Sequence, residues 1–135
     1  MRLLFMKSLF QKEEEIMYAI WDIGHPCVIS EILEKYPKLK RNTVAKVLNV
    51  LVDKGYLKVD SIVKTSTRTG RAYAPLIKKE VYQEQKRLME EIVESDNVQE
   101  GILSYCSTLI DSESPSEEFI CELEKMIEQY KNRED

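Results

Sequence analysis

One short segment limits the possible folds of this chain more than any other. Between residues 41 and 54, the apolar residues Val44, Val47, Leu48 and Leu51 follow the i, i+3, i+4, i+7 spacing of a helix with one buried face. The polar side of the same helix carries Asn42, Ala45, Lys46 and Asn49. Gly55 follows, at the place where a left-handed residue often ends a helix. The segment therefore predicts an amphipathic helix with a defined end.

Helical patterns precede this segment and strand patterns follow it. Residues 11–22 and 28–36 carry apolar residues at helical spacing, and turn residues and prolines at 24–26 and 37 end these two stretches. After Gly55, residues 56–63 and 71–76 have the composition of strands, and the polar stretch 64–70 joins them as a turn. Three short helices followed by a β-hairpin predict a winged helix-turn-helix.

The C-terminal part of the chain has three further helical stripes of apolar residues, around residues 81–93, 102–110 and 119–130. Two segments resemble capping boxes that start the second and third of these helices. They are Asp96-x-x-Gln99 and Ser114-Pro115-Ser116-Glu117, the latter with Pro115 at the first helical position. We therefore expect a mostly α-helical protein with a winged-helix domain in residues 1–79 and a three-helix domain in residues 80–135.

Three amphipathic helices of this size bury little apolar surface if they stand alone. Pairing two copies around a twofold axis would supply the missing surface. The sequence therefore predicts a homodimer formed through residues 80–135. The expected interface residues are Leu88, Ile92, Ile102, Leu103, Leu109, Phe119, Leu123 and Ile127.

Charge is distributed very unevenly along the chain. Residues 1–79 contain 15 Lys and Arg against 8 Asp and Glu, a net charge of +7, and residues 80–135 contain 5 against 16, a net charge of −11. Together they give the overall net charge of −4. From residue 35 to residue 79, 12 basic residues face only Asp53 and Asp60. A segment this basic favours contact with a polyanion.

The predicted third helix and wing offer the side chains that contact with double-stranded DNA requires. Asparagine can bind adenine through two hydrogen bonds, lysine reaches guanine or phosphate, and arginine on a wing suits the minor groove or the phosphate backbone. The candidate DNA-binding residues are Lys40, Arg41, Asn42, Thr43, Lys46, Asn49, Lys64, Arg68 and Arg71.

Enzyme activity is not expected. His25 is the single histidine, it lies in a predicted turn, and no nucleophile or acid forms a recognisable constellation with it. Cys27, Cys106 and Cys121 are odd in number and widely spaced, which predicts no disulfide framework, no metal site and no cofactor. The longest apolar run, residues 16–21, is far shorter than the roughly 20 residues that span a bilayer. We therefore expect a cytoplasmic protein.

An alternative function stays open at this point. A winged helix can lose DNA binding and serve as a protein-interaction adaptor. That alternative predicts a third helix with few basic residues or with an exposed apolar patch. Lys46 and its basic neighbours do not fit, whereas an exposed Val50 would fit.

Two runs of residues resemble the penicillinase-repressor family, the BlaI, MecI and CopY type of winged-helix transcription regulators. The first run is Asn42-Thr43-Val44-x-x-Val47-Leu48-x-x-Leu51-x-x-Lys54-Gly55-Tyr56-Leu57, and the second is Gly70-Arg71-Ala72-Tyr73-Ala74-Pro75. Residues 13–21 are similar to that family's first helix, in which an acidic start leads to a stripe that ends in tryptophan. The resemblance covers residues 10 to 132.

The resemblance implies a dimeric repressor that binds a palindromic operator and controls antibiotic-resistance genes. It also implies a membrane-bound sensor protease as partner, with a cut in the dimerisation region that relieves repression. By position the equivalent bond is Ser104-Tyr105, which keeps the aromatic residue of the family's Asn-Phe bond but not its asparagine. Cys106 and Cys121 do not form the paired C-x-C motifs of the copper-responsive branch.

Overall fold

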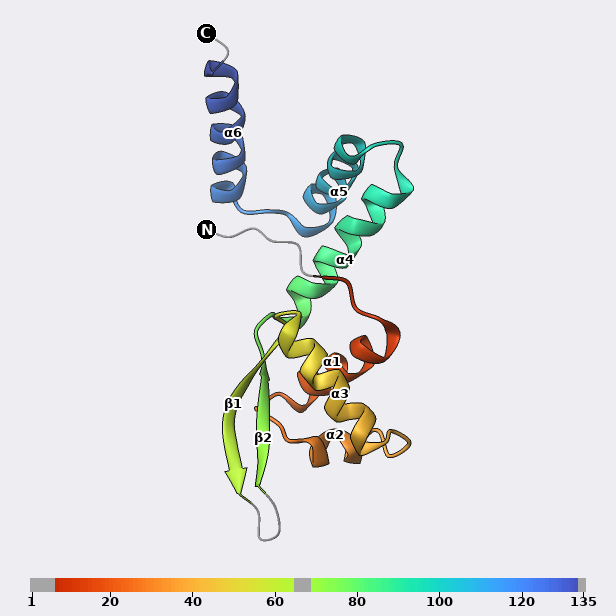
Figure 1. The fold of residues 1–135 in the computed structure, drawn as a ribbon. Coiled ribbons are helices and arrows are strands. Elements are labelled where there is room, and N and C mark those ends of the chain that lie inside the picture. Colours follow the sequence, from red (N-terminus) through yellow and green to blue (C-terminus); the bar gives the residue numbers. More distant parts are fainter. Residues whose placement is uncertain (1–6, 65–68, 134–135) are drawn as a thin grey trace. The chain divides into compact units, whose positions relative to one another are not determined.

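The computed structural model describes residues 7–64 and 69–133 of the chain. Within these ranges, six helices and one two-stranded sheet follow one another (Figure 1). Their order is α1 (Gln11–Ile23), α2 (Ile29–Lys35), α3 (Arg41–Asp53), β1 (Leu57–Lys64), β2 (Thr69–Pro75), α4 (Lys79–Glu94), α5 (Val98–Glu113) and α6 (Glu117–Asn132). The predicted fold class, a winged helix followed by a helical part, is confirmed.

The chain forms two compact units, Met1–Gln85 and Lys86–Asp135. The first turns of α4 belong to the first unit, where Tyr82 is buried. The predicted division at residue 79, between a DNA-binding and a dimerisation domain, concerns what the two parts do and stays a prediction.

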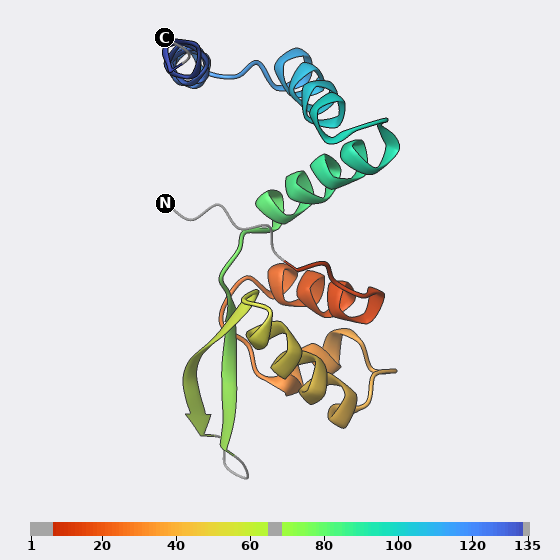
Figure 2. The same ribbon diagram turned by 45° about the horizontal axis from the view of Figure 1, so that its top comes forward.

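The core of the first unit lies where α1, α2 and α3 meet the base of the hairpin (Figure 2). The predicted stripe of α3 faces inward, because Val44, Leu48 and Leu51 are fully buried and Val47 is half-buried. Ile16, Met17 and Ile20 of α1, Ile32 of α2, and Tyr56 and Leu57 at the base of the hairpin complete this core.

Glycines end two structural elements of the first unit as the sequence predicts. Gly24 has a φ of 78° and its N–H donates to the carbonyl of Ile20, which closes the end of α1. Gly55 has a φ of 85° and turns the chain from α3 into β1. An L-residue other than glycine would be strained in this left-handed conformation.

The hairpin is antiparallel, and its register pairs Leu57 with Pro75 at the base and Lys64 with Thr69 toward the tip. An irregularity between Val59 and Ser61 shifts the register. Tyr73 is fastened to the body of the unit, because it exchanges two backbone hydrogen bonds of 3.0 and 2.8 Å with Cys27. The second strand begins two residues earlier than predicted, since Thr69 and Gly70 still pair with β1.

The helix starts in the second unit differ from the two predicted capping boxes. Asn97, not Asp96, caps α5 by accepting a hydrogen bond from the Glu100 N–H. Ser116 caps α6 by accepting from the Phe119 N–H, so Pro115 precedes the cap and is not the first helical residue. Both predictions were wrong by one or two residues, because neighbouring Asp, Asn and Ser residues can all serve as caps.

Candidate nucleic-acid interface

The predicted recognition face is the solvent side of α3. Asn42, Lys46 and Asn49 are exposed there, and Thr43 and Ala45 are half-buried. Lys40 and Arg41, at the start of the helix, are exposed as well. Because the opposite side of α3 is held in the core by Val44, Leu48 and Leu51, the helix cannot turn these polar residues inward without losing that burial.

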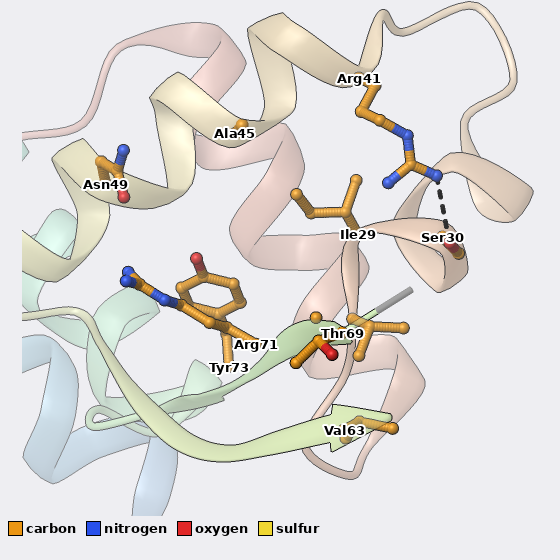
Figure 3. A pocket seen from close by; sticks show the side chains of 11 residues that line it. Ile29, Ser30, Arg41, Ala45, Asn49, Val63, Thr69, Arg71 and Tyr73 are labelled. Carbon is orange, nitrogen blue, oxygen red and sulfur yellow. Dashed lines mark hydrogen bonds between the residues drawn. The ribbon is translucent and has the colours of Figure 1, made fainter. Parts of the chain in front are cut away.

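A groove of about 760 Å³ lies beside α3, between this helix, the start of α2 and the wing. It brings together three of the predicted residues, Arg41 and Asn49 from α3 and Arg71 from β2 (Figure 3). The full lining is Val28, Ile29, Ser30, Arg41, Ala45, Asn49, Val63, Thr69, Gly70, Arg71 and Tyr73. The groove is therefore lined by both polar and apolar side chains, with one arginine from α3 and another from β2.

Arg41 is held at one end of the groove by a side chain that the sequence did not single out. Its guanidinium donates a hydrogen bond of 3.2 Å to the Ser30 hydroxyl (Figure 3). Ser30 lies in the first turn of α2, and only the packing of α2 against α3 brings it to this position. No local pattern in the sequence signals such a contact.

Other predicted residues lie outside the groove. Asn42, Thr43 and Lys46 occupy the α3 surface next to it, and Lys64 is exposed at the end of β1. Arg68 lies outside the described residues, so the structure gives it no position. The predicted residues thus lie in three places: in the groove, on the α3 surface beside it, and at the end of the wing strand β1.

Part of the positive charge of residues 35–79 is paired with carboxylates of the same chain and is not available to bind a partner. The Lys54 ammonium donates 2.6 Å to the Glu13 carboxylate and lies over the Phe10 ring. Lys79 lies 4.0 Å from the Asp22 carboxylate and over Tyr18. In contrast, no carboxylate of the described residues lies within ion-pair distance of Arg41, Lys46 or Arg71. Arg41 and Lys46 of α3 and Arg71 of β2 therefore keep their positive charge available for a partner.

Two further reactive side chains of the first unit, His25 and Cys27, lie close together in the sequence. His25 is exposed, with its Nδ1 2.9 Å from the Pro26 carbonyl and its Nε2 3.5 Å from Glu31. Cys27 is buried, and this burial, with the nearby Glu31 carboxylate, raises the pKa of its thiol to about 11. The residues in ranges 7–64 and 69–133 include no group of three or more metal ligands.

The predicted dimer residues lie on the three helices of the C-terminal part and are incompletely covered in the single chain. Leu103 is 68% exposed, and Ile102, Phe119 and Ile127 are also exposed. Leu88, Ile92, Leu109 and Leu123 are half-buried. Helix α6 buries no residue at all along its described length.

The predicted cleavage bond lies in the middle of α5. Ser104 is exposed and its hydroxyl donates 2.9 Å to a Glu91 carboxylate oxygen, and Tyr105 is half-buried. A peptide bond inside a regular helix is closed to a protease until that part of the helix unfolds, because proteases cleave extended chain.

None of the helices in residues 7–64 and 69–133 has both the length and the apolar character that a membrane span requires.

A three-helix core, a hairpin wing and a groove between them that is lined by Arg41 and Arg71 define a protein of the winged-helix class. The chain belongs to the penicillinase repressor family, whose model matches residues 9–129. The members of this family are regulators and not enzymes. No curated protein sequence matches the chain.

Proposed function

We propose that the chain is a homodimeric transcriptional repressor that binds a palindromic DNA operator in the cytoplasm. The observation that carries this proposal is the groove between α3 and the wing, with Arg41 and Arg71 on its sides and the exposed polar face of α3 beside it. The family supports repression, and this surface supports contact with DNA.

The arrangement suits one particular part of the double helix. An α-helix fits the major groove of B-DNA, and Asn42, Lys46 and Asn49 would there face the base edges. The wing would reach the neighbouring minor groove. The phosphate strand that separates the two grooves then passes over the space between α3 and the wing, where Arg41 and Arg71 can hold it.

The exposed apolar side chains of α5 and α6 support pairing of two copies. Phe119, Ile127 and Leu103 leave apolar surface in water that a second copy can cover. Pairing also makes the second DNA contact intramolecular, which raises affinity by factors of about 100 to 10,000. A twofold dimer would match half-sites one helical turn apart, about 34 Å.

We also propose that repression is relieved by a cut at Ser104-Tyr105, made after a membrane sensor protease detects the inducing β-lactam, and that the regulated genes confer antibiotic resistance. The cut would divide α5 and separate the paired copies, so DNA is released without any change in α3. Mass spectrometry of the repressor from induced cells tests this directly. A fragment ending at residue 104 is expected, and an intact chain after full induction would contradict the proposal.

A salt titration of binding to the chain's own promoter DNA and to random DNA tests DNA binding. Each neutralised phosphate should contribute about −0.9 to the slope of log K against log salt. Asn42→Ala or Asn49→Ala should narrow the gap between promoter and random DNA by about 1–3 kcal/mol. Lys64→Ala should instead weaken both alike. A flat salt response would contradict phosphate contact.

The adaptor alternative has one observation in its favour. Val50 on α3 is 37% exposed and Ile62 on the wing is 66% exposed, so the first unit carries some apolar surface. If both DNAs bind equally weakly at all salt concentrations, these residues become the first candidates for a protein contact.

A further inference from the structure

The base of the wing and the start of α4 meet in a cluster of four aromatic rings. Tyr18 and Trp21 come from α1, Tyr56 directly precedes β1, and Tyr82 lies in the first turn of α4. The Tyr82 ring centroid lies 5.5 Å from that of Trp21, 5.9 Å from that of Tyr56 and 6.4 Å from that of Tyr18. We call these four residues the aromatic junction.

Hydrogen bonds fasten the chain around the aromatic junction. The Tyr82 hydroxyl donates 2.5 Å to Glu14 of α1. The Trp21 indole N–H donates 3.0 Å to the Ile77 carbonyl, and the Leu76 N–H donates 2.8 Å to the Tyr56 carbonyl. Both strands of the wing are therefore held at the junction, β1 by the residue before it and β2 by the residues after it.

Most of the wing is exposed beyond its base. Every described residue of β1 after Leu57 is exposed, and in β2 only Ala72 and Tyr73 are buried. Besides the backbone bridge between Tyr73 and Cys27, β1 contacts α3, and β2 contacts α1 and α2. These contacts and the aromatic junction together determine the direction of the wing. Only residues 76–78 separate β2 from α4.

We propose that Tyr82 is a positioning residue for the wing. Its ring and its bond to Glu14 hold the start of α4 against α1, and this contact adds to those of α1, α2 and α3 in setting the direction in which β1 and β2 leave the body of the unit. A movement of the first turn of α4 would therefore be passed on through residues 76–78 to the wing, which carries Arg71 and Lys64. This inference rests on the proposed DNA binding, because the wing matters only if it contacts DNA.

Double-mutant cycles in the full-length chain test the proposal. Tyr82→Phe keeps the ring and removes the bond to Glu14, and we expect it to weaken promoter binding about fivefold. In a Lys64→Ala, Arg71→Ala background, which lacks the wing cations, the same change should cost less than about twofold. In a Lys46→Ala background it should still cost about fivefold, because distant sites contribute additively. Equal losses in all three backgrounds would overturn the proposal.

Hydrogen exchange without DNA separates this inference from the proposed function. Tyr82→Phe should speed exchange of the Leu76 amide and of the β1–β2 amides at least threefold, and leave the α3 amides unchanged. Unchanged wing exchange would overturn the positioning role, whereas a wild-type chain that fails to bind DNA would overturn the proposed function instead. Tyr18→Phe is the matched control, because the Tyr18 hydroxyl only accepts a 3.4 Å bond from Gln83 and leaves the Tyr82 bond intact.

Discussion

The two units of the chain differ sharply in how completely they bury their apolar side chains. Every fully or nearly fully buried apolar side chain of the described residues lies between Ile16 and Tyr82, inside the first unit. In the second unit Gly101 is the one buried residue of the described range, and large side chains such as Leu103 and Met126 are mostly exposed. The first unit therefore closes its own core, whereas the second leaves its large apolar side chains exposed, and the proposed second copy would supply the partner surface that covers them.

The largest expected loss of promoter binding comes from a variant that disrupts that partner surface. Ile127→Asp puts a charge on the exposed apolar side of α6, and we expect a monomer in analytical ultracentrifugation at micromolar concentration. Promoter binding should then fall about 100- to 10,000-fold, since the second DNA contact is no longer intramolecular.

Cys121→Asp is the matched control for this variant. Cys121 is an exposed residue of the same helix and lies away from the stripe of Phe119, Leu123 and Ile127. The control should remain dimeric and bind DNA normally. A dimeric Ile127→Asp variant would mean that α6 does not form the interface.

The next effect contrasts the two units directly. Leu48→Ala removes a fully buried side chain of the first unit and should lower the free energy of unfolding by about 2–5 kcal/mol. Leu103→Ala, made in the monomeric Ile127→Asp chain, should change it by less than about 0.5 kcal/mol, because this leucine is 68% exposed. Urea unfolding measures both. A large cost at Leu103 in the monomer would show that the second unit has a closed core of its own.

Within the first unit, features set by neighbouring residues were predictable from the sequence, and contacts between distant residues were not. The inward stripe of α3 and the turn at Gly55 follow from local spacing, and both are confirmed. The groove depends on Ser30 meeting Arg41 across 11 residues, and the Lys54–Glu13 pair joins residues 41 positions apart. Such contacts arise from the packing of helices on each other, which single-sequence periodicity does not specify.

The acidic run at the start of α1 shows the limit of a local interpretation. A helix dipole accounts for glutamates in a first turn. In the structure, Glu13 is buried, accepts a hydrogen bond from the Phe10 N–H and binds Lys54, while Glu14 accepts from Tyr82. Neighbouring residues of similar character therefore have different partners, which depend on the side of α1 that each one occupies.

A smaller effect tests the packing inside the second unit. A Cβ added to Gly101 of α5 would lie 2.6 Å from the Ile92 Cα and 3.0 Å from the Ile92 N, both backbone atoms of α4. Alanine normally stabilises a helix over glycine by about 1 kcal/mol. Here the crowding should outweigh that gain, and Gly101→Ala should cost about 1–3 kcal/mol in urea unfolding.

Two further variants sharpen the Gly101 test. Ser107→Ala, at an exposed position of the same helix, should be neutral or slightly stabilising. Ile92→Ala should not rescue Gly101→Ala, because the closest approach is to the backbone of residue 92 and not to the end of its side chain. A stabilised Gly101→Ala chain would mean that α4 and α5 do not pack this closely.

The smallest expected effect is on how the free energy of unfolding of the first unit depends on pH. Burial, with the nearby Glu13 and Glu14 carboxylates, raises the pKa of the Tyr56 phenol from 10.0 to about 12, and its hydroxyl donates 2.6 Å to the Lys7 carbonyl. A raised pKa in the folded state means that the folded chain keeps this proton to a higher pH than the unfolded chain does. The stabilisation is therefore complete below pH 10 and is lost as the pH rises toward 12.

Comparison of the wild-type chain with Tyr56→Phe isolates this contribution. Between pH 8 and pH 10.5, the wild type should lose roughly 1 kcal/mol more unfolding free energy than the variant, because only the wild type must keep the Tyr56 phenol neutral. Burial also raises the pKa of Cys27 and Tyr82. The loss at Cys27 is the same in both chains and cancels, and most of the loss at Tyr82 cancels too, because burial and Glu14 raise its pKa more than Tyr56 does. Equal pH dependence in the two chains would mean that Tyr56 is hydrated in solution and that the core of the first unit is open at this point.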